Sequence, residues 1–106
     1  MVKTILTEAG FVEDETFIET QFITPPNMTY AIFTDSFTRR GADKVNFLKE
    51  HSYTIEVYSD FGDPAAEARI EAVLDRYGIE HDKDERFWIQ SEQLFQTVYT
   101  FDFVEK

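Results

Sequence analysis

The segment from Ser52 to Gly78 constrains the fold more than any other part of the chain, because it carries three local structure signals in succession. Residues 45–58 place mostly apolar or aromatic side chains at odd positions and mostly polar ones at even positions, which is typical of a half-buried antiparallel strand. Asp63 and Pro64 then predict a helix start, since aspartate can cap a first-turn amide and proline suits the first helical position. Gly78 predicts the helix end.

The predicted helix over residues 64–77 is amphipathic. Its apolar stripe consists of Ala66, Ile70, Val73, Leu74 and Tyr77, and its predicted surface residues are Glu67, Arg69, Glu71, Asp75 and Arg76. One apolar stripe with charges around the rest predicts a helix that packs a single face on a sheet.

The other segments complete an α+β pattern. The predicted elements are a helix at 2–9, strands at 28–37 and 45–58, the helix at 64–77, and strands at 86–89 and 94–104. Residues 16–23 could also be extended before the two prolines that follow them. We therefore expect a single domain over residues 1–106: a two-layer α+β fold with a mainly antiparallel four-stranded sheet and two helices on one face. The expected order is helix-strand-strand-helix-strand-strand.

Charge and composition exclude several partners. The formal net charge is −11, whereas nucleic acids and anionic lipids attract clustered Lys and Arg, so we expect neither nucleic-acid nor membrane binding. The chain has no cysteine, which excludes disulfides. It has no apolar run near the ~18 residues of a spanning helix, and no apolar signal-peptide stretch follows its N-terminus, so the default compartment is the cytosol.

Few residues could carry chemistry. We expect a structural or interface role for His51 and a solvated polar loop around His81, because the spacing and the glycine of a Ca²⁺ loop are absent there. The serines lack a Gly-x-Ser-x-Gly setting, and the four scattered glycines form no phosphate loop. We therefore expect no enzyme activity, no catalytic residues, no metal and no cofactor.

Two features indicate a contact surface instead. Arg39 and Arg40 lie near the tip of the predicted hairpin in a very acidic chain, either as solvated turn residues or as a contact with the acidic surface of an identical subunit. The aromatic residues at 33, 37, 47, 61 and 88 exceed what one small core can hold, so we expect some of them to be interface anchors. The candidate interface residues are Arg39, Arg40, Asp43, Lys44, Phe47 and Trp88.

Four ordered patterns span residues 25–104. They are Pro25-Pro26 with Met28-Thr-Tyr-Ala-Ile-Phe33, then His51-Ser-Tyr-Thr-Ile-Glu-Val-Tyr-Ser59, then Glu67-Ala-Arg-Ile-Glu-Ala-Val-Leu-Asp75 with Tyr77-Gly-Ile79, and finally Trp88-Ile-Gln-Ser-Glu-Gln-Leu-Phe-Gln-Thr-Val-Tyr-Thr-Phe101. Together they resemble small tail proteins of long-tailed phages and prophages of Gram-positive bacteria. These are known as tail terminator, tail completion or head-tail joining proteins.

The resemblance implies a structural virion protein without catalytic residues. Such proteins form a ring, commonly of six subunits, that caps the tail tube, stops its growth and then presents a surface to the head connector. The implied partners are further copies of the chain, the tail tube protein and the head connector protein. The implied location is the virion tail or neck, with the bacterial host cytoplasm as the place of assembly. Residues 38–44 and the last strand are then expected at subunit contacts, and a head-to-tail interface would close the ring.

Two alternatives remain open from the residues alone. An acidic protein-binding module, such as an inhibitor that mimics nucleic acid or an antitoxin, would place its carboxylates as a stripe on one face. In this sequence the acidic residues spread over helix, turns and strands, which favours ordinary solubility. A small-ligand enzyme would need a concave pocket that contains His51 or His81.

Overall fold

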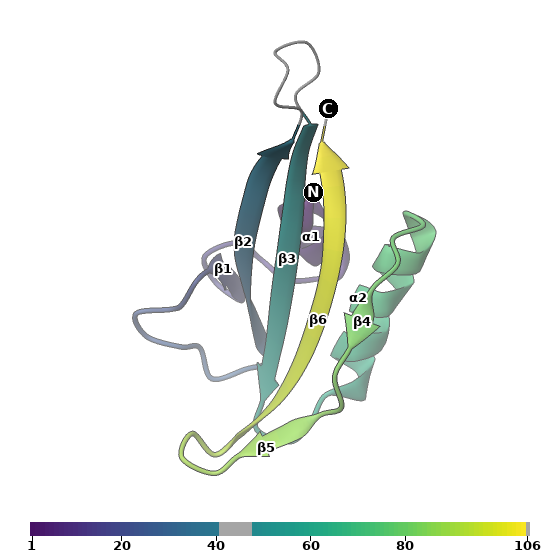
Figure 1. Ribbon diagram of the computed structural model, residues 1–106. Helices are drawn as coiled ribbons and strands as arrows, with labels where there is room; N and C mark the ends of the chain where they lie inside the picture. The colour runs from purple at the N-terminus through teal and green to yellow at the C-terminus, as the bar shows by residue number, and fades with distance from the viewer. Residues whose placement is uncertain (41–47, 106) are drawn as a thin grey trace.

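The computed structural model describes residues 1–40 and 48–105, with side chains described for residues 1–36 and 50–103. In these described residues, two helices and six strands follow one another (Figure 1). They are α1 (Val2–Glu8), β1 (Phe17–Glu19), β2 (Tyr30–Arg40), β3 (Leu48–Ser59), α2 (Pro64–Arg76), β4 (Asp82–Lys83), β5 (Phe87–Ile89) and β6 (Leu94–Glu105). The chain is therefore a mixed α+β protein, as the sequence predicts.

Three long strands form the centre of the sheet. The strand order is β1-β2-β3-β6-β4, and β5 pairs with β6 next to β4. β3 pairs antiparallel with β2 on one side and with β6 on the other, so that Ile55 lies opposite Phe33 and Tyr99. β1 pairs with β2 in parallel. The hairpin predicted from residues 28–37 and 45–58 is thus confirmed as β2 and β3.

The sheet formed by the described residues has six strands, and the prediction of four was wrong. The two additional strands are β1 and β4, with three and two residues. Both residues of β4 are charged and exposed, so the segment gives no apolar alternation that a sequence pattern could detect. β1 ends at Glu19, because the next residue, Thr20, is a non-glycine residue with a positive φ of 73° that does not continue a strand.

A single hydrophobic core joins both helices to alternate residues of the sheet. The odd-numbered residues of β3 and β6 supply its sheet side, as the period-two pattern predicts. The core consists of Val2, Ile5, Leu6, Ala9, Phe11, Phe17, Ala31, Phe33, Tyr53, Ile55, Val57, Ala66, Ile70, Val73, Leu74, Tyr99 and Phe101. Both helices therefore contribute apolar residues to the same core as the sheet. In the part of the chain that the structure describes, no helix is long and apolar enough to cross a membrane.

The ends of α2 follow the predicted capping chemistry. The Ala66 amide donates to Asp63 Oδ1 at 3.0 Å, and Thr29 Oγ1 donates to Asp63 Oδ2 at 2.7 Å. At the other end Gly78 has a φ of +68°, and the amide of Ile79 donates to the Leu74 carbonyl at 2.9 Å. These contacts confirm both predicted helix ends and direct the chain after α2 back towards β6.

Two residues of α2 differ from their predicted placement. Glu67, expected on the surface, is only 5% exposed, whereas Tyr77, expected in the apolar stripe, is 42% exposed. Glu67 lies three residues before Ile70 and seven before Leu74, so the helical period places it on the buried face. Tyr77 follows the last helical residue, and its hydroxyl donates to a carboxylate oxygen of Glu8 on α1.

Candidate interaction surfaces

The predicted interface residues are distributed over two opposite ends of the sheet. Arg39 and Arg40 are the last residues of β2 and pair in register with Lys49 and Leu48 of β3. Trp88 lies in β5, which pairs with the first residues of β6. This pairing lies at the end of the sheet opposite to Arg39 and Arg40 (Figure 1). The predicted residues therefore do not form one continuous surface.

The remaining predicted interface residues, Asp43, Lys44 and Phe47, lie outside the described residues. So does most of the predicted contact segment 38–44. The side chains of Phe37, Arg39 and Arg40 also fall outside the description, although their backbone is part of β2. Their role in subunit contacts stays a prediction.

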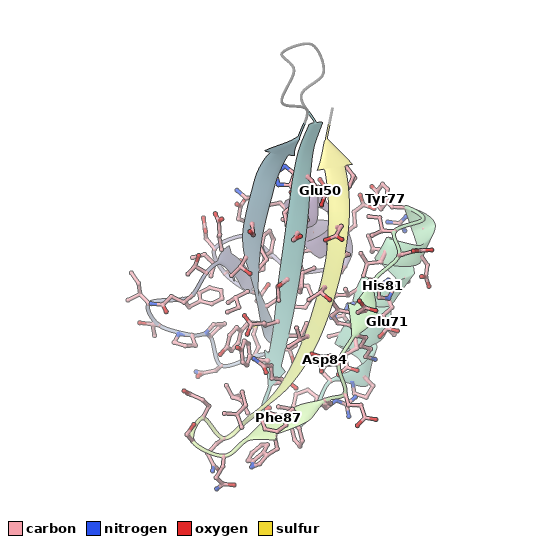
Figure 2. The ribbon with its side chains drawn as sticks, viewed as in Figure 1. Glu50, Glu71, Tyr77, His81, Asp84 and Phe87 are labelled. Atoms are coloured by element: carbon pink, nitrogen blue, oxygen red, sulfur yellow. The ribbon has the colours of Figure 1, made fainter. Side chains whose placement is uncertain are left out.

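The β5 end of the sheet exposes aromatic residues. The Trp88 ring packs 4.8 Å from the ring of Phe95 on β6, and its indole nitrogen donates to Gln90 Oε1 at 3.0 Å. Phe61 is 67% exposed and Phe87 is 63% exposed; Figure 2 shows Phe87 at the lower end of the sheet. Of the aromatic residues expected to exceed the core, Phe61 and Trp88 do lie outside it, whereas Phe33 is a core residue. Exposed aromatic side chains at one end of a molecule are typical of contact surfaces.

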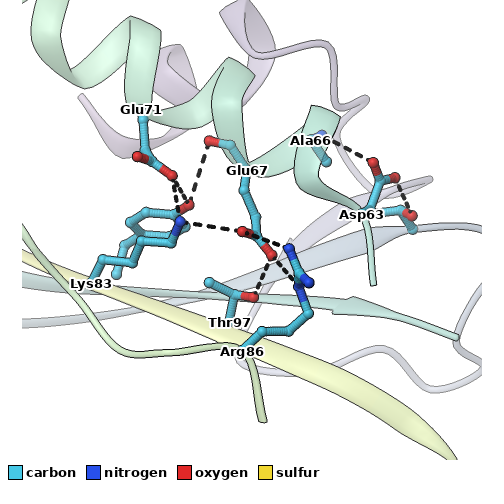
Figure 3. Close-up of polar contacts among 9 residues, drawn as sticks. Asp63, Ala66, Glu67, Glu71, Lys83, Arg86 and Thr97 are labelled. Atoms are coloured by element: carbon cyan, nitrogen blue, oxygen red, sulfur yellow. Dashed lines mark hydrogen bonds and ion pairs between the residues drawn. The ribbon is translucent and has the colours of Figure 1, made fainter. Parts of the chain in front are cut away.

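A buried carboxylate fastens the segment that carries β4 and β5 to α2 (Figure 3). Glu67 Oε2 accepts hydrogen bonds from Arg86 Nε at 2.9 Å and from Thr97 Oγ1 at 2.8 Å. Its other oxygen, Oε1, lies 3.2 Å from Lys83 Nζ. Burial alone would raise the pKa of Glu67, but the hydrogen bonds from Arg86, Thr97 and Lys83 outweigh it and lower the pKa. The carboxylate is therefore ionised and fully partnered in the fold.

A second carboxylate extends this cluster towards the sheet. Glu71 Oε2 accepts from Lys83 Nζ at 2.8 Å and from the Tyr99 hydroxyl at 2.7 Å. Burial and the hydrogen bond to Glu71 raise the pKa of Tyr99, so its hydroxyl stays protonated and acts as the donor. We define the Glu67 cluster as Glu67, Glu71, Lys83, Arg86, Thr97 and Tyr99. Every member of the cluster has a partner within it, which is the arrangement expected of a structural clamp.

The two histidines occupy different settings. His51 is 8% exposed, its Nδ1 lies 2.9 Å from Asp35 Oδ1, and its ring stacks on Tyr53 at 5.2 Å. His81 is half-buried, and its Nδ1 lies 3.2 Å from the Ile79 carbonyl. Across residues 1–40 and 48–105, no group of three or more metal-binding side chains is close enough to hold an ion. Both histidines thus make contacts that fit a structural role.

The sheet face made by even-numbered residues carries a polar and aromatic hollow of about 390 Å³. The Tyr30 and Tyr58 rings stack at 5.2 Å, and the Phe22 ring meets Tyr30 edge-on at 5.5 Å. Gln96 Nε2 donates to the Tyr58 hydroxyl oxygen at 2.9 Å, and that hydroxyl donates to Glu56 Oε1 at 3.0 Å. Burial raises the pKa of Tyr58 to about 12. The tyrosine is therefore neutral at physiological pH and holds a fixed hydrogen-bond network.

A groove of about 970 Å³ lies between β6 and the segment that leads from α2 to β4. We call it the β6 groove; its lining residues are Asp75, 77–82 and 100–103. Figure 2 shows Tyr77 and His81 on the segment beside β6. The buried Phe101 and the partly buried Ile79 and Phe103 make part of its lining apolar. The groove thus combines apolar contact area with the polar groups of a turn.

The groove is also strongly acidic. Its carboxylates are those of Asp75, Glu80, Asp82 and Asp102, and its lining contains no Lys or Arg. Ser52 Oγ donates to Asp102 Oδ1 at 2.9 Å. Within the described part of the chain, none of these four carboxylates forms an ion pair. Four carboxylates without ion pairs in the described chain, around a partly apolar lining, favour a partner that carries positive charge.

The fold resembles that of a chain in a solved virion structure. The chain is similar to a chain in the virion of a native gene transfer agent particle, with a TM-score of 0.59 and 16% sequence identity. The similarity covers 92% of this chain and 81% of that chain. The sequence matches no protein-family model and no curated protein sequence. At 16% identity the likeness is one of fold, and it extends over nearly the whole of this chain.

Proposed function

We propose that this chain is a structural protein of a tailed phage or prophage that forms a ring at the end of the tail tube and joins it to the head connector. In this role it acts without catalysis or cofactor, binds its own copies, the tube protein and the connector protein, and resides in the virion. It belongs to the head-proximal tail or neck and is assembled in the bacterial cytoplasm.

The fold likeness to the gene transfer agent virion chain is the observation that carries this proposal. It adds a likeness of fold to the sequence patterns in residues 25–104 that resemble tail terminator and head-tail joining proteins, and both support a protein of a virion. The two lines of support cover much the same part of the chain. A virion role therefore agrees with both better than an antitoxin or a small-ligand enzyme does.

The distribution of surfaces also supports a ring subunit. A subunit between a tube and a connector needs contacts with neighbouring copies and contacts along the particle axis. This chain presents an exposed aromatic surface at the β5 end and an acidic groove beside the other end of β6. Separate surfaces on one small domain suit a part that touches several different neighbours.

The experiment that tests the proposal is deletion of the gene from the phage or prophage that carries it. A protein that ends the tail tube should leave, when absent, tails of abnormal and variable length and heads without tails. Electron microscopy of lysates measures tail length and the fraction of joined particles directly.

Two controls make the deletion interpretable. Expression of the wild-type gene from a plasmid should restore uniform, joined particles, and deletion of a gene outside the virion gene cluster should leave them unchanged. Normal numbers of intact virions with tails of ordinary length in the deletion strain would contradict the proposed function.

A further inference from the structure

The outer edge of β6 is only partly covered. β5 pairs with residues 94–96, β4 pairs with Tyr99 and Thr100, and the Asp84 amide donates to the Val98 carbonyl at 2.9 Å. Among the described residues, no strand pairs with this edge beyond Thr100. The β6 groove begins where that cover ends, because residues 100–103 line it.

Backbone groups point from β6 into this uncovered edge. The two backbone groups of one residue in an antiparallel strand point to the same side, and the side alternates along the strand. Val98 directs its carbonyl outward to Asp84, so Thr100 and Asp102 also direct their backbone groups outward. Thr100 pairs with Asp82, and Asp102 lies beyond that pair. The groove therefore offers an extended partner segment hydrogen-bonding groups, apolar side chains and four carboxylates.

The charge of the chain restricts which partner segment fits. Two copies with a net charge of −11 repel one another, so a local concentration of positive charge favours a contact between them. The five basic residues with described side chains are already engaged within the chain: Lys3, Arg76, Lys83 and Arg86 pair with carboxylates, and Arg69 donates to a carbonyl. The other five are Arg39, Arg40, Lys44, Lys49 and Lys106, of which only Arg39 and Arg40 are adjacent in the sequence.

The end of β2, which carries this arginine pair, and the β6 groove lie at the same end of the sheet, with β3 and β6 between them. Arg39 pairs in register with Lys49, which pairs with Glu105, so the end of β2 lies near the level of the uncovered end of β6. β3 and β6 stand between the end of β2 and the groove. A contact of one copy's β2 end with another copy's groove is therefore heterologous, which is the kind of contact that repeats around a ring.

We propose that the β6 groove receives the end of β2 of a second copy, so that its Arg39 and Arg40 pair with the groove carboxylates. This inference rests on the proposed ring function and names the surface through which the ring closes. Ion pairs at the rim set the register between copies, while the apolar lining and the open strand edge receive the extended backbone.

Charge exchange tests the contact. The groove variant is Glu80→Lys with Asp82→Lys, the strand-end variant is Arg39→Glu with Arg40→Glu, and the exchange variant carries all four substitutions. Assembly is measured by native mass and by electron microscopy, both for the chain alone and with purified tail tubes, so that assembly only on tubes is also counted. We expect each double variant to raise the concentration for half-assembly by about tenfold or more, because like charges then face each other.

Restoration is the decisive readout. The exchange variant, and an equimolar mixture of the two double variants, should assemble within about threefold of the wild-type concentration, because opposite charges meet again. The matched control is Glu15→Lys with Asp60→Lys, which makes the same charge change at exposed positions outside the groove. That control reduces overall repulsion and should assemble at least as well as the wild type.

The outcomes separate this inference from the proposed function. A groove variant that assembles like the control, or an exchange variant no better than either double variant, overturns the docking of β2 in the groove. If those proteins still bind tail tubes, the ring function stands and another surface closes the ring. A wild-type chain that assembles neither alone nor on tubes overturns both proposals.

Discussion

The two ends of β6 differ in whether other strands cover the outer edge of β6. At its beginning, β4 and β5 cover the edge, and the Glu67 cluster ties their segment to α2. Towards its end, the described residues place no strand along the edge, and four carboxylates without ion pairs line a groove there. The first arrangement satisfies polar groups inside one chain, whereas the second leaves them available to a neighbour.

This difference indicates where the chain obtains stability and where it has room for function. Buried charges are costly unless each is partnered, and the Glu67 cluster partners each of its charges. Exposed charges contribute little to folding. Changes at the clamp should therefore affect unfolding, and changes at the groove should affect assembly while leaving folding nearly unchanged.

The largest effect is expected from Glu67→Ala. This change leaves Arg86, Lys83 and Thr97 without their shared acceptor. We expect the free energy of unfolding to fall by about 3 kcal/mol. This value is at the low end for a broken buried ion pair, because Arg86 and Lys83 are partly exposed to water. Urea unfolding followed by circular dichroism measures it. Glu92→Ala, at an exposed glutamate without an ion pair in the described chain, is the control and should change stability by less than about 0.5 kcal/mol. Equal losses in the two variants would contradict the clamp.

The same carboxylate should make stability depend on pH. The pKa of Glu67 lies below its ordinary value of 4.5 in the folded chain, so its contribution is present above about pH 4.5 and is lost as the pH falls through the lower folded value. Glu67→Gln removes this titration. Thermal unfolding should show that the wild type is more stable than Glu67→Gln at pH 7. The difference in stability between the two proteins should become smaller as the pH is lowered to 3. A difference in stability that stays constant or grows in acid would be inconsistent with a lowered pKa of Glu67.

A smaller effect is expected from Tyr99→Phe. The substitution keeps the buried ring but removes the hydroxyl that donates to Glu71, and it should cost about 1 kcal/mol, as for a typical hydrogen bond. Tyr77→Phe is a matched control, since Tyr77 is exposed and also donates to a glutamate. Surface placement should reduce its cost to about 0.5 kcal/mol or less. A larger loss of unfolding free energy for Tyr77→Phe than for Tyr99→Phe would contradict the contrast between the Glu67 cluster and the β6 groove.

The smallest effect on folding is expected at the β6 groove. Glu80→Lys with Asp82→Lys alters two exposed side chains without ion pairs among the described residues, so the free energy of unfolding should change by less than about 0.5 kcal/mol. Differential scanning calorimetry of the monomer measures this. A loss of 2 kcal/mol or more would mean that the groove acids hold the fold, and the contrast with the Glu67 cluster would disappear.

The sequence predicts those parts of the fold that carry a repeating or capping signal. Alternation over residues 45–58 identified β3, and Asp63 with Gly78 identified the ends of α2. The two-residue strand β4 has no such signal; it pairs with β6, and its Lys83 contacts the Glu67 cluster. The three-residue spacing of Glu67 to Ile70 is the signal for its burial, whereas its charge favours a surface position.

The candidate surfaces were less predictable than the fold. Trp88 was identified from the excess of aromatic residues, and it does lie outside the core. The β6 groove was not predicted, because its acidic residues are far apart in the sequence and meet only where the turn after α2 passes β6. Its carboxylates could not be distinguished from the other acidic residues of a chain with 21 Asp and Glu.

The central claim, a ring at the end of the tail tube, is tested most directly by electron cryo-microscopy of tails purified from the phage or prophage that carries this gene. Image averaging of both tail ends, with the chain located by a specific antibody fragment, shows where it lies. We expect a closed ring of this chain at the head-proximal end of each tail and nowhere along the tube. Density for the chain along the whole tube, or its absence from purified tails, would contradict the account.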